Sequence, residues 1–148
     1  RHPPASLLLS GTPGNGKTQC AAWCCAALPT IAFVWVVWPD LVKEMRSEYG
    51  KEDRHFDERA IALASAALLV IDDLTVPTAG DDRDLLQRLI DVRWREKKPT
   101  IITSNLALPD MEKAGLDART ASRIASYDKV VFRGEDFRRK PRATKGEM

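Results

Sequence analysis

The residues with the clearest chemistry form the segment Gly11–Thr18, which fits G-x-x-x-x-G-K-[ST] and follows an apolar run. Its glycines let consecutive backbone N–H groups turn toward an anion, where a Cβ would clash or forbid the required backbone angles. Lys17 would reach the β- and γ-phosphates of a nucleotide, and the Thr18 hydroxyl would ligate Mg²⁺. We therefore expect ATP or ADP to bind with Mg²⁺. The expected contacts are Gly11, Thr12, Pro13, Gly14, Asn15, Gly16, Lys17, Thr18 and Gln19.

Acidic residues end a second apolar run, Leu68–Asp73. Asp72 is placed to hold Mg²⁺ through water, and Asp73 to orient or activate the attacking water. Asn105 ends a later run, where it could hold that water or a γ-phosphate oxygen without adding charge. Asn also ends strands for reasons of turn chemistry, so a structural role for Asn105 stays open.

These residues must be positioned by regular elements. Pro and Gly divide the chain into apolar segments of β type and segments with helical periodicity, and the two kinds alternate. This pattern is typical of a parallel sheet covered on both faces. We expect strands over 5–10, 31–38, 68–73, 100–105 and 130–132. We expect helices from about residue 17, over 39–49, ending near 67, over 81–97, after 108–110, and over 118–125.

Composition limits the organisation of the chain. At 148 residues and 44% hydrophobic content, we expect one domain over residues 1–137 and a basic tail over 138–148 that is mobile or makes a contact. Lys and Arg number 23 against 21 Asp and Glu, so nucleic-acid binding would need a local basic patch. No apolar run is long enough for a membrane span, and we expect a cytoplasmic protein. The chain begins just before its first strand, so we also expect it to be part of a longer protein.

Two clusters are expected to be structural. The thiols of Cys20, Cys24 and Cys25 fall within one helix and fit small apolar packing residues, with a metal site or disulfide as the alternative. The cations Arg93, Arg95, Lys97 and Lys98 end another helix, where positive charge is stabilising without any partner.

Together these residues resemble the AAA+ ATPase domain of bacterial and phage replicative helicase loaders of the DnaC and DnaI type, and IstB-like transposition helper ATPases are similar. The resemblance covers nearly the whole chain and rests on Gly11–Thr18, Leu68–Asp73, Thr100–Leu106 and Arg119–Ile124. It implies a three-layer α/β P-loop NTPase fold with a five-stranded parallel sheet in the order 5-1-4-3-2 and no clear C-terminal lid. It also implies that Asn105 lies between Lys17 and Asp72 as a γ-phosphate sensor.

The resemblance gives a role to Arg119 and Arg123, which share one helix face at a spacing of four. In the family such a pair reaches the nucleotide of a neighbouring subunit, and Arg123 matches the arginine finger. This implies head-to-tail self-association in the ATP state. Two solvated helix arginines are the alternative.

The resemblance also implies single-stranded DNA binding by helices after the second strand, over about 40–64. Cations that follow phosphates and aromatic rings that stack on bases are the required ingredients. The candidates are Lys43, Arg46, Lys51, Arg54 and Arg59, with Tyr49 and Phe56. Acidic residues occur in the same stretch, so an ordinary solvated face is an equally good interpretation of it.

The leading functional hypothesis is an ATP-binding and hydrolysing module of a replicative helicase loader, whose helicase contact lies in a region outside this chain. Asp73 stands where the family often has Glu, so we expect slow hydrolysis. An IstB-like transposition helper and a nucleotide-gated adaptor with little turnover are the alternatives. A small-molecule phosphotransferase would need a lid and an acceptor pocket for which no segment is evident.

Overall fold

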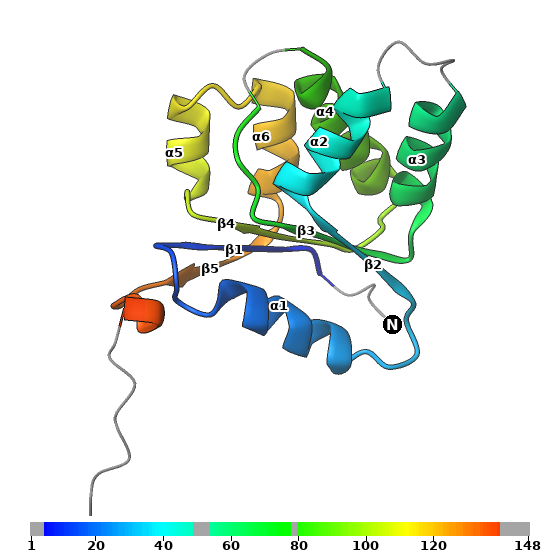
Figure 1. Ribbon diagram of the computed structural model, residues 1–148. Helices are drawn as coiled ribbons and strands as arrows, with labels where there is room; N and C mark the ends of the chain where they lie inside the picture. Colours follow the sequence, from blue (N-terminus) through cyan, green and yellow to red (C-terminus); the bar gives the residue numbers. More distant parts are fainter. Residues whose placement is uncertain (1–4, 49–53, 78–79, 140–148) are drawn as a thin grey trace, which may run out of the picture.

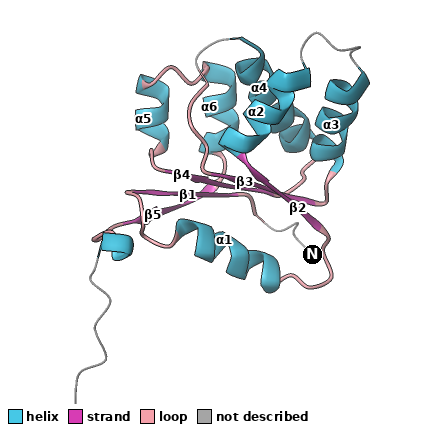
Figure 2. Ribbon diagram, in the orientation of Figure 1, coloured by secondary structure: helices cyan, strands magenta, loops and turns pink. Residues whose placement is uncertain are grey.

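The computed structural model describes residues 5–48, 54–77 and 80–139, and these form an α/β/α sandwich of three layers (Figures 1 and 2). The five strands are β1 Leu7–Gly11, β2 Phe33–Val37, β3 Leu68–Asp72, β4 Thr100–Ser104 and β5 Asp128–Phe132. All neighbouring strands are parallel, in the order β2-β3-β4-β1-β5. The expected order 5-1-4-3-2 is confirmed, since the two descriptions read the sheet from opposite edges.

Helices cover both faces of the sheet. They are α1 Lys17–Ala26, α2 Trp38–Glu48, α3 Arg54–Ser65, α4 Gly80–Arg95, α5 Leu108–Lys113 and α6 Ala118–Ala125, with a 3-10 helix at Phe137–Arg139. Helix α1 packs on one face, and α2 to α6 pack on the other (Figure 1). Each crossover places a helix between parallel strands, as a parallel sheet requires.

Several boundaries differ from the expected ones for local reasons. Trp38 begins α2 instead of ending the strand, because the missing N–H of Pro39 costs nothing in the first helical turn. Strand β5 begins at Asp128, two residues early, because it pairs with the whole of β1. Helix α4 ends at Arg95, and the left-handed Lys97 (φ 55°) lets the Lys98 N–H donate to the Arg93 carbonyl at 2.9 Å.

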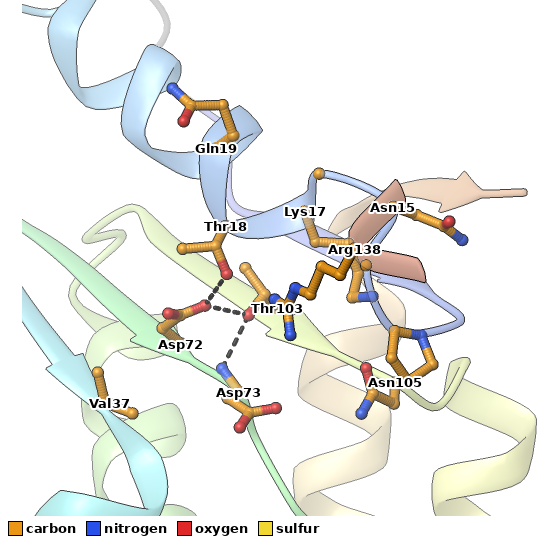
Figure 3. A pocket seen from close by; sticks show the side chains of 13 residues that line it. Asn15, Lys17, Thr18, Gln19, Val37, Asp72, Asp73, Thr103, Asn105 and Arg138 are labelled. Carbon is orange, nitrogen blue, oxygen red and sulfur yellow. Dashed lines mark hydrogen bonds between the residues drawn. The ribbon is translucent and has the colours of Figure 1, made fainter. Parts of the chain in front are cut away.

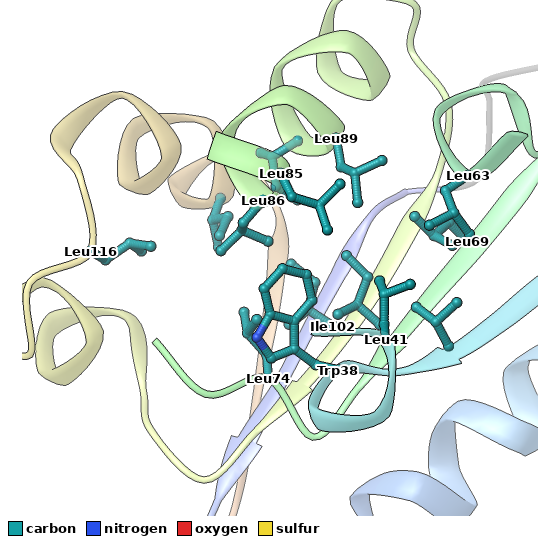
Figure 4. Close-up of a cluster of buried hydrophobic side chains, with 14 of the residues drawn as sticks. Trp38, Leu41, Leu63, Leu69, Leu74, Leu85, Leu86, Leu89, Ile102 and Leu116 are labelled. Atoms are coloured by element: carbon teal, nitrogen blue, oxygen red, sulfur yellow. The ribbon is translucent and has the colours of Figure 1, made fainter. Parts of the chain in front are cut away.

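The core lies on both sides of the sheet. On the larger side, Trp38 packs among leucines of α2, α3 and α4 (Figure 4). Strand side chains alternate between the two faces: Leu8, Leu69, Ile71 and Ile102 join the larger cluster, and Leu9, Leu68, Val70 and Ile101 join the α1 side. By the same alternation, Asp72 and Thr103 belong to the α1 side, where the glycine-rich loop enters its helix.

The cysteines of α1 pack as expected of small apolar residues. Cys25 is buried, Cys20 and Cys24 are half-buried against the sheet, and all three are free thiols. Burial raises the pKa of the Cys25 thiol, and Cys24 beside it raises it further. Within the described ranges, no helix has the length and apolar character needed to cross a membrane.

Arg93 was expected to be a helix-end cation that needs no partner, but it is fully buried and is held by hydrogen-bond partners. Its Nε donates to the Thr100 hydroxyl at 2.8 Å, and its terminal nitrogens donate to four carbonyls at 2.6 to 3.1 Å. Those carbonyls belong to Leu63, Ala64, Ala66 and Pro99. Three of them lie at the end of α3, where carbonyls lack helical partners and the helix dipole is negative. Burial lowers the pKa of Arg93 to about 10.

We predict that Arg93→Met lowers the free energy of unfolding by about 2–4 kcal/mol, because it removes hydrogen bonds from acceptors at the end of α3 and at the start of β4. Urea unfolding followed by circular dichroism measures this change. Arg95→Met is the matched control, since the Arg95 side chain is 61% exposed and its loss should change the free energy by less than about 0.5 kcal/mol. Equal effects of the two substitutions would contradict the assignment.

Candidate nucleotide-binding site

A cavity of about 600 Å³ opens at the carboxyl ends of the strands (Figure 3). It is lined by Pro13, Gly14, Asn15, Gly16, Lys17, Thr18, Gln19, Val37, Asp72, Asp73, Thr103, Asn105 and Arg138. The structure thus brings the glycine-rich loop together with Asp72, Asp73 and Asn105, three residues that the sequence analysis singled out. Ligands of open parallel sheets bind at this edge.

The loop leads directly into α1. Gly16 occupies the N-cap position with φ 84°, and no side chain caps the helix, which leaves its first N–H groups for an external acceptor. The Lys17 ammonium donates to the carbonyls of Gly11 at 2.9 Å and Thr12 at 2.7 Å. Burial lowers the pKa of Lys17, and nearby Arg138 lowers it too, whereas Asp73 and Asp72 raise it.

A hydrogen-bonded chain joins α1, β3 and β4. The hydroxyls of Thr18 and Thr103 both donate to Asp72 Oδ1, at 2.9 and 2.6 Å. The backbone N–H of Asp73 donates to the Thr103 hydroxyl at 2.8 Å. Figure 3 shows these three bonds in sequence. Thr103 therefore uses both its donor and its acceptor to hold the two aspartates, and Asp72 is fixed from two elements.

Asp73 adopts a left-handed backbone (φ 58°), a conformation that costs a non-glycine residue on the order of 1 kcal/mol. The turn is fixed from β4: the Leu74 N–H donates to the Thr103 carbonyl, and the Ser104 hydroxyl donates to the Leu74 carbonyl, both at 2.8 Å. This sharp turn keeps Asp73 exposed in the cavity wall beyond the end of the strand.

The residues present fit a Mg²⁺ ion. The Thr18 hydroxyl and the Asp72 carboxylate lie 2.9 Å apart and supply the hard oxygen ligands that Mg²⁺ prefers. Among the described residues, no cluster of three or more His, Cys, Asp or Glu forms a dedicated metal cage. A Mg²⁺ ion held by one or two protein oxygens takes its remaining ligands from phosphate and water.

The segment after β5 packs against the loop. A Cβ on Gly14 (φ 77°) would collide with the Asp136 carboxylate, and a Cβ on Gly11 with the Phe132 carbonyl. Asp136 accepts the backbone N–H of Arg138 at 2.9 Å, and Arg138 lines the cavity. Arg138 is thus part of the site wall, whereas the sequence analysis assigned it to a tail. The rest of that tail, from residue 140, lies outside the described residues.

Sequence reasoning missed Thr103 and Arg138. Thr103 was detectable in principle, because it lies two residues after Ile101 on a strand expected next to Asp72. Arg138 was not, because it begins a basic run, 138–145, in which nothing distinguishes one cation from the next.

Arg119 and Arg123 do not line the cavity. They lie on α6 and contact Asp91 of α4: Arg119 makes hydrogen bonds of 3.1 to 3.3 Å, and Arg123 Nε lies 3.5 Å from the carboxylate. Their expected role at the nucleotide of a neighbouring subunit stays a prediction.

The expected DNA-contacting residues are only partly described. Lys43 is exposed on α2, and Arg46 pairs with Asp82 of α4. Lys51 and the side chain of Arg54 lie outside the described part of the chain, as do Tyr49 and the side chain of Phe56. A pocket beside α2 and α3 is lined by Glu44, Met45, Glu48, Glu58 and Arg59. The described part of this face is therefore mixed in charge, and DNA binding there stays a prediction.

The family match decides the relationship. A family model described as "IstB-like ATP binding protein" matches residues 3–143. This chain belongs to that family. The resemblance seen in the sequence is therefore confirmed, and the IstB-like chain is an AAA+ P-loop protein of an ATP-binding family.

Two further comparisons agree with this family. The IstB-like chain is 26% identical over 140 residues to the replicative helicase loader DnaC of Escherichia coli K12, covering 90% of this chain and 56% of that protein. It thus spans little more than half the length of this curated relative. A crystal structure of the DnaC helicase loader is similar in fold, with a TM-score of 0.72, 24% identity, and coverage of 89% of this chain and 80% of that one.

A third comparison extends the fold to replication initiators. AMPPCP-bound DnaA from Aquifex aeolicus has a TM-score of 0.74 at 18% identity, covering 89% of the IstB-like chain and 42% of DnaA. At 18% identity, this similarity shows a shared fold and nothing about function.

We predict that Thr103→Val in the IstB-like chain lowers the free energy of unfolding by about 1–3 kcal/mol, because a polar N–H and a carboxylate oxygen each lose a partner. Thr103→Ser keeps the hydroxyl and should retain most of the stability. Thermal and urea unfolding distinguish the two variants. If the serine variant proved as unstable as the valine variant, packing of the methyl group would matter more than the hydrogen bonds.

Proposed function

We propose that this chain is the ATP-binding and hydrolysing module of a helicase loader, which couples ATP state and self-association to single-stranded DNA binding. The observation that supports this proposal most is the joint lining of one cavity by Lys17, Thr18, Asp72, Asp73 and Asn105. A loop that binds phosphate needs only the first two. The strand-end acids and amide add the groups that hydrolysis requires.

Phosphate recognition follows from the loop and α1. Lys17 would exchange two neutral carbonyl acceptors for phosphate oxygens, which are stronger acceptors because they are charged. The uncapped N–H groups of α1 would point at the same anion. Arg138, which lies near Lys17 and also lines the cavity, would add a second cation.

Hydrolysis would proceed by attack of a water oxygen on the γ-phosphorus, with cleavage of its bond to the bridging oxygen of ADP. Asp73 would orient the water and accept its proton, and Asn105 would hold the water or a γ-oxygen. Thr18 and Asp72 would hold Mg²⁺, which supplies positive charge to the phosphate oxygens. Asp73 is one methylene shorter than Glu, and we expect the step to be slow.

The loader role extends what is described for DnaC of Escherichia coli, a replicative helicase loader. In this proposal, copies of the chain associate head to tail in the ATP state, so that Arg123 of one copy completes the site of the next. Single-stranded DNA would contact the α2 and α3 side through Lys43 and its neighbours. The helicase would be contacted outside this chain.

Two alternatives share the same site. Membership of the IstB-like ATP-binding family keeps the alternative of a transposition helper ATPase, which would differ in partner and not in chemistry. Asp73 in the position of Glu favours a nucleotide-gated adaptor with little turnover. Tight ATP binding with negligible hydrolysis at all protein concentrations would identify the adaptor.

We predict that ATP hydrolysis per molecule rises with protein concentration, because the site is completed by a second copy. Phosphate release measures the rate, with and without single-stranded DNA. Lys17→Ala should abolish binding of a fluorescent ATP analogue, and Arg123→Ala should retain binding but lose the rise. A rate that is insensitive to concentration in both the native chain and Arg123→Ala would contradict the shared site.

We predict that Arg138→Ala weakens ATP binding about tenfold, as expected for loss of one charge-assisted contact. Isothermal titration calorimetry with a non-hydrolysable analogue measures the affinity. Arg139→Ala is the matched control, because its side chain is 89% exposed and it does not line the cavity. A similar loss in both variants would indicate a general charge effect.

A further inference from the structure

A cluster of three arginines and one carboxylate joins α4 and α6 away from the cavity. Asp91 is 13% exposed and pairs with Arg95 at 3.3 Å, Arg119 at 3.1 Å and Arg123 at 3.5 Å. Burial opposes ionisation of Asp91, but the arginines outweigh it and hold its pKa below the usual range. One negative charge thus faces three positive charges, and the cluster keeps a net positive charge.

The two α6 arginines contact Asp91 in different ways. Arg119 uses both Nε and a terminal nitrogen on the carboxylate, so its hydrogen-bonding fork is engaged within its own chain. Arg123 Nε lies 3.5 Å from an Asp91 carboxylate oxygen, an ion-pair contact in which this buried nitrogen makes no hydrogen bond to a described residue. Within the described residues its two terminal nitrogens make no hydrogen bond, and a quarter of the side chain is exposed. The terminal nitrogens of Arg123, which are the atoms that could bind a phosphate, are therefore free.

Trp94 supports the other side of the Arg123 guanidinium. The Arg123 Cζ lies 3.8 Å from the centroid of the indole ring, which is the geometry of a cation–π contact. The ring itself is fixed, because its Nε1–H donates to the Ser126 hydroxyl at 3.2 Å, and that hydroxyl donates to the Arg123 carbonyl at 2.6 Å. Trp94 keeps 41% of its surface exposed, so the contact lies at the surface.

We propose that Asp91 and Trp94 are positioning residues that hold Arg123 with its terminal nitrogens free for the nucleotide phosphates of a second copy, while Arg119 stays bound to Asp91 as part of the support. This proposal rests on the shared site proposed above. A pre-oriented guanidinium loses less side-chain entropy when it meets a phosphate, which favours both association and the transition state.

The test mixes two variants that complement each other only across a shared site. The acceptor is Arg123→Ala, which keeps its own nucleotide site. The donor is Lys17→Ala, which keeps Arg123 but cannot use its own site. Hydrolysis above the sum of the separate variants then comes from the acceptor's nucleotide and the donor's Arg123.

A second change in the donor tests the positioning role. Trp94→Leu in the donor should lower kcat of the mixed site about 3- to 10-fold, as expected for loss of a cation–π contact, with KM for ATP unchanged. Trp94→Phe keeps a ring face and should restore most of the rate. Trp23→Leu is the matched control, because Trp23 is an exposed tryptophan on α1, on the other face of the sheet. It should have no effect.

A readout without turnover accompanies the rates. Association of donor and acceptor in AMPPCP, measured by analytical ultracentrifugation, should weaken with Trp94→Leu in the donor by a similar factor. Asp91→Asn in the donor keeps the size of the side chain and removes its charge, and it gives a second measurement if the leucine variant does not fold. It should also lower kcat of the mixed site.

The outcomes separate two failures. If the unaltered donor does not complement the acceptor, the shared site is wrong and the positioning proposal falls with it. If that donor complements, but donors with Trp94→Leu or Asp91→Asn complement equally well, only the positioning proposal is overturned. Loss of complementation with Arg119→Ala in the donor, without loss from Trp94→Leu, would assign the phosphate contact to Arg119 instead.

Discussion

The shared carboxylate oxygen of Asp72 is the contact on which the site depends. Two hydroxyls converge on it, one from the start of α1 and one from β4, so three elements are fixed relative to one another at the cavity floor. The Thr103 hydroxyl also accepts the backbone N–H of Asp73 and so fixes the position of that backbone. Because hydrogen bonds to a carboxylate are stronger than those between neutral groups, this small network holds the expected metal ligands in register.

A second constraint comes from the absence of side chains at Gly11 and Gly14. A Cβ on Gly11 would collide with the Phe132 carbonyl at the end of β5, and a Cβ on Gly14 would collide with the Asp136 carboxylate in the segment after β5. The glycines therefore do more than permit an anion-binding turn. They allow the end of the described chain to lie against the loop, which brings Arg138 to the cavity even though it lies far from the loop in sequence.

Much of the fold was predictable from the sequence, because most apolar runs were bounded by Pro, Gly or acid and each run matched one strand. The helix expected from about Ala118 to Ala125 has those bounds in the structure. Arg93 could not be placed, since a cation in a basic helix end looks the same whether it faces water or the carbonyls of another helix. The loop residues, Asp72, Asp73 and Asn105 came from motifs, whereas Thr103 and Arg138 became visible only through strand adjacency and packing.

The alternation of side chains along β3 has a consequence for how such a chain can diverge. Asp72 faces the loop because it is in phase with Leu68 and Val70, whereas Leu69 and Ile71 fill the opposite core. Inserting or deleting one residue inside this strand would exchange the two sets, moving a carboxylate into the apolar core and an isoleucine beside the phosphates. Substitutions can accumulate in this strand one at a time, but insertions and deletions cannot. Related chains should therefore differ in length in the segments between strands, while each strand keeps its number of residues.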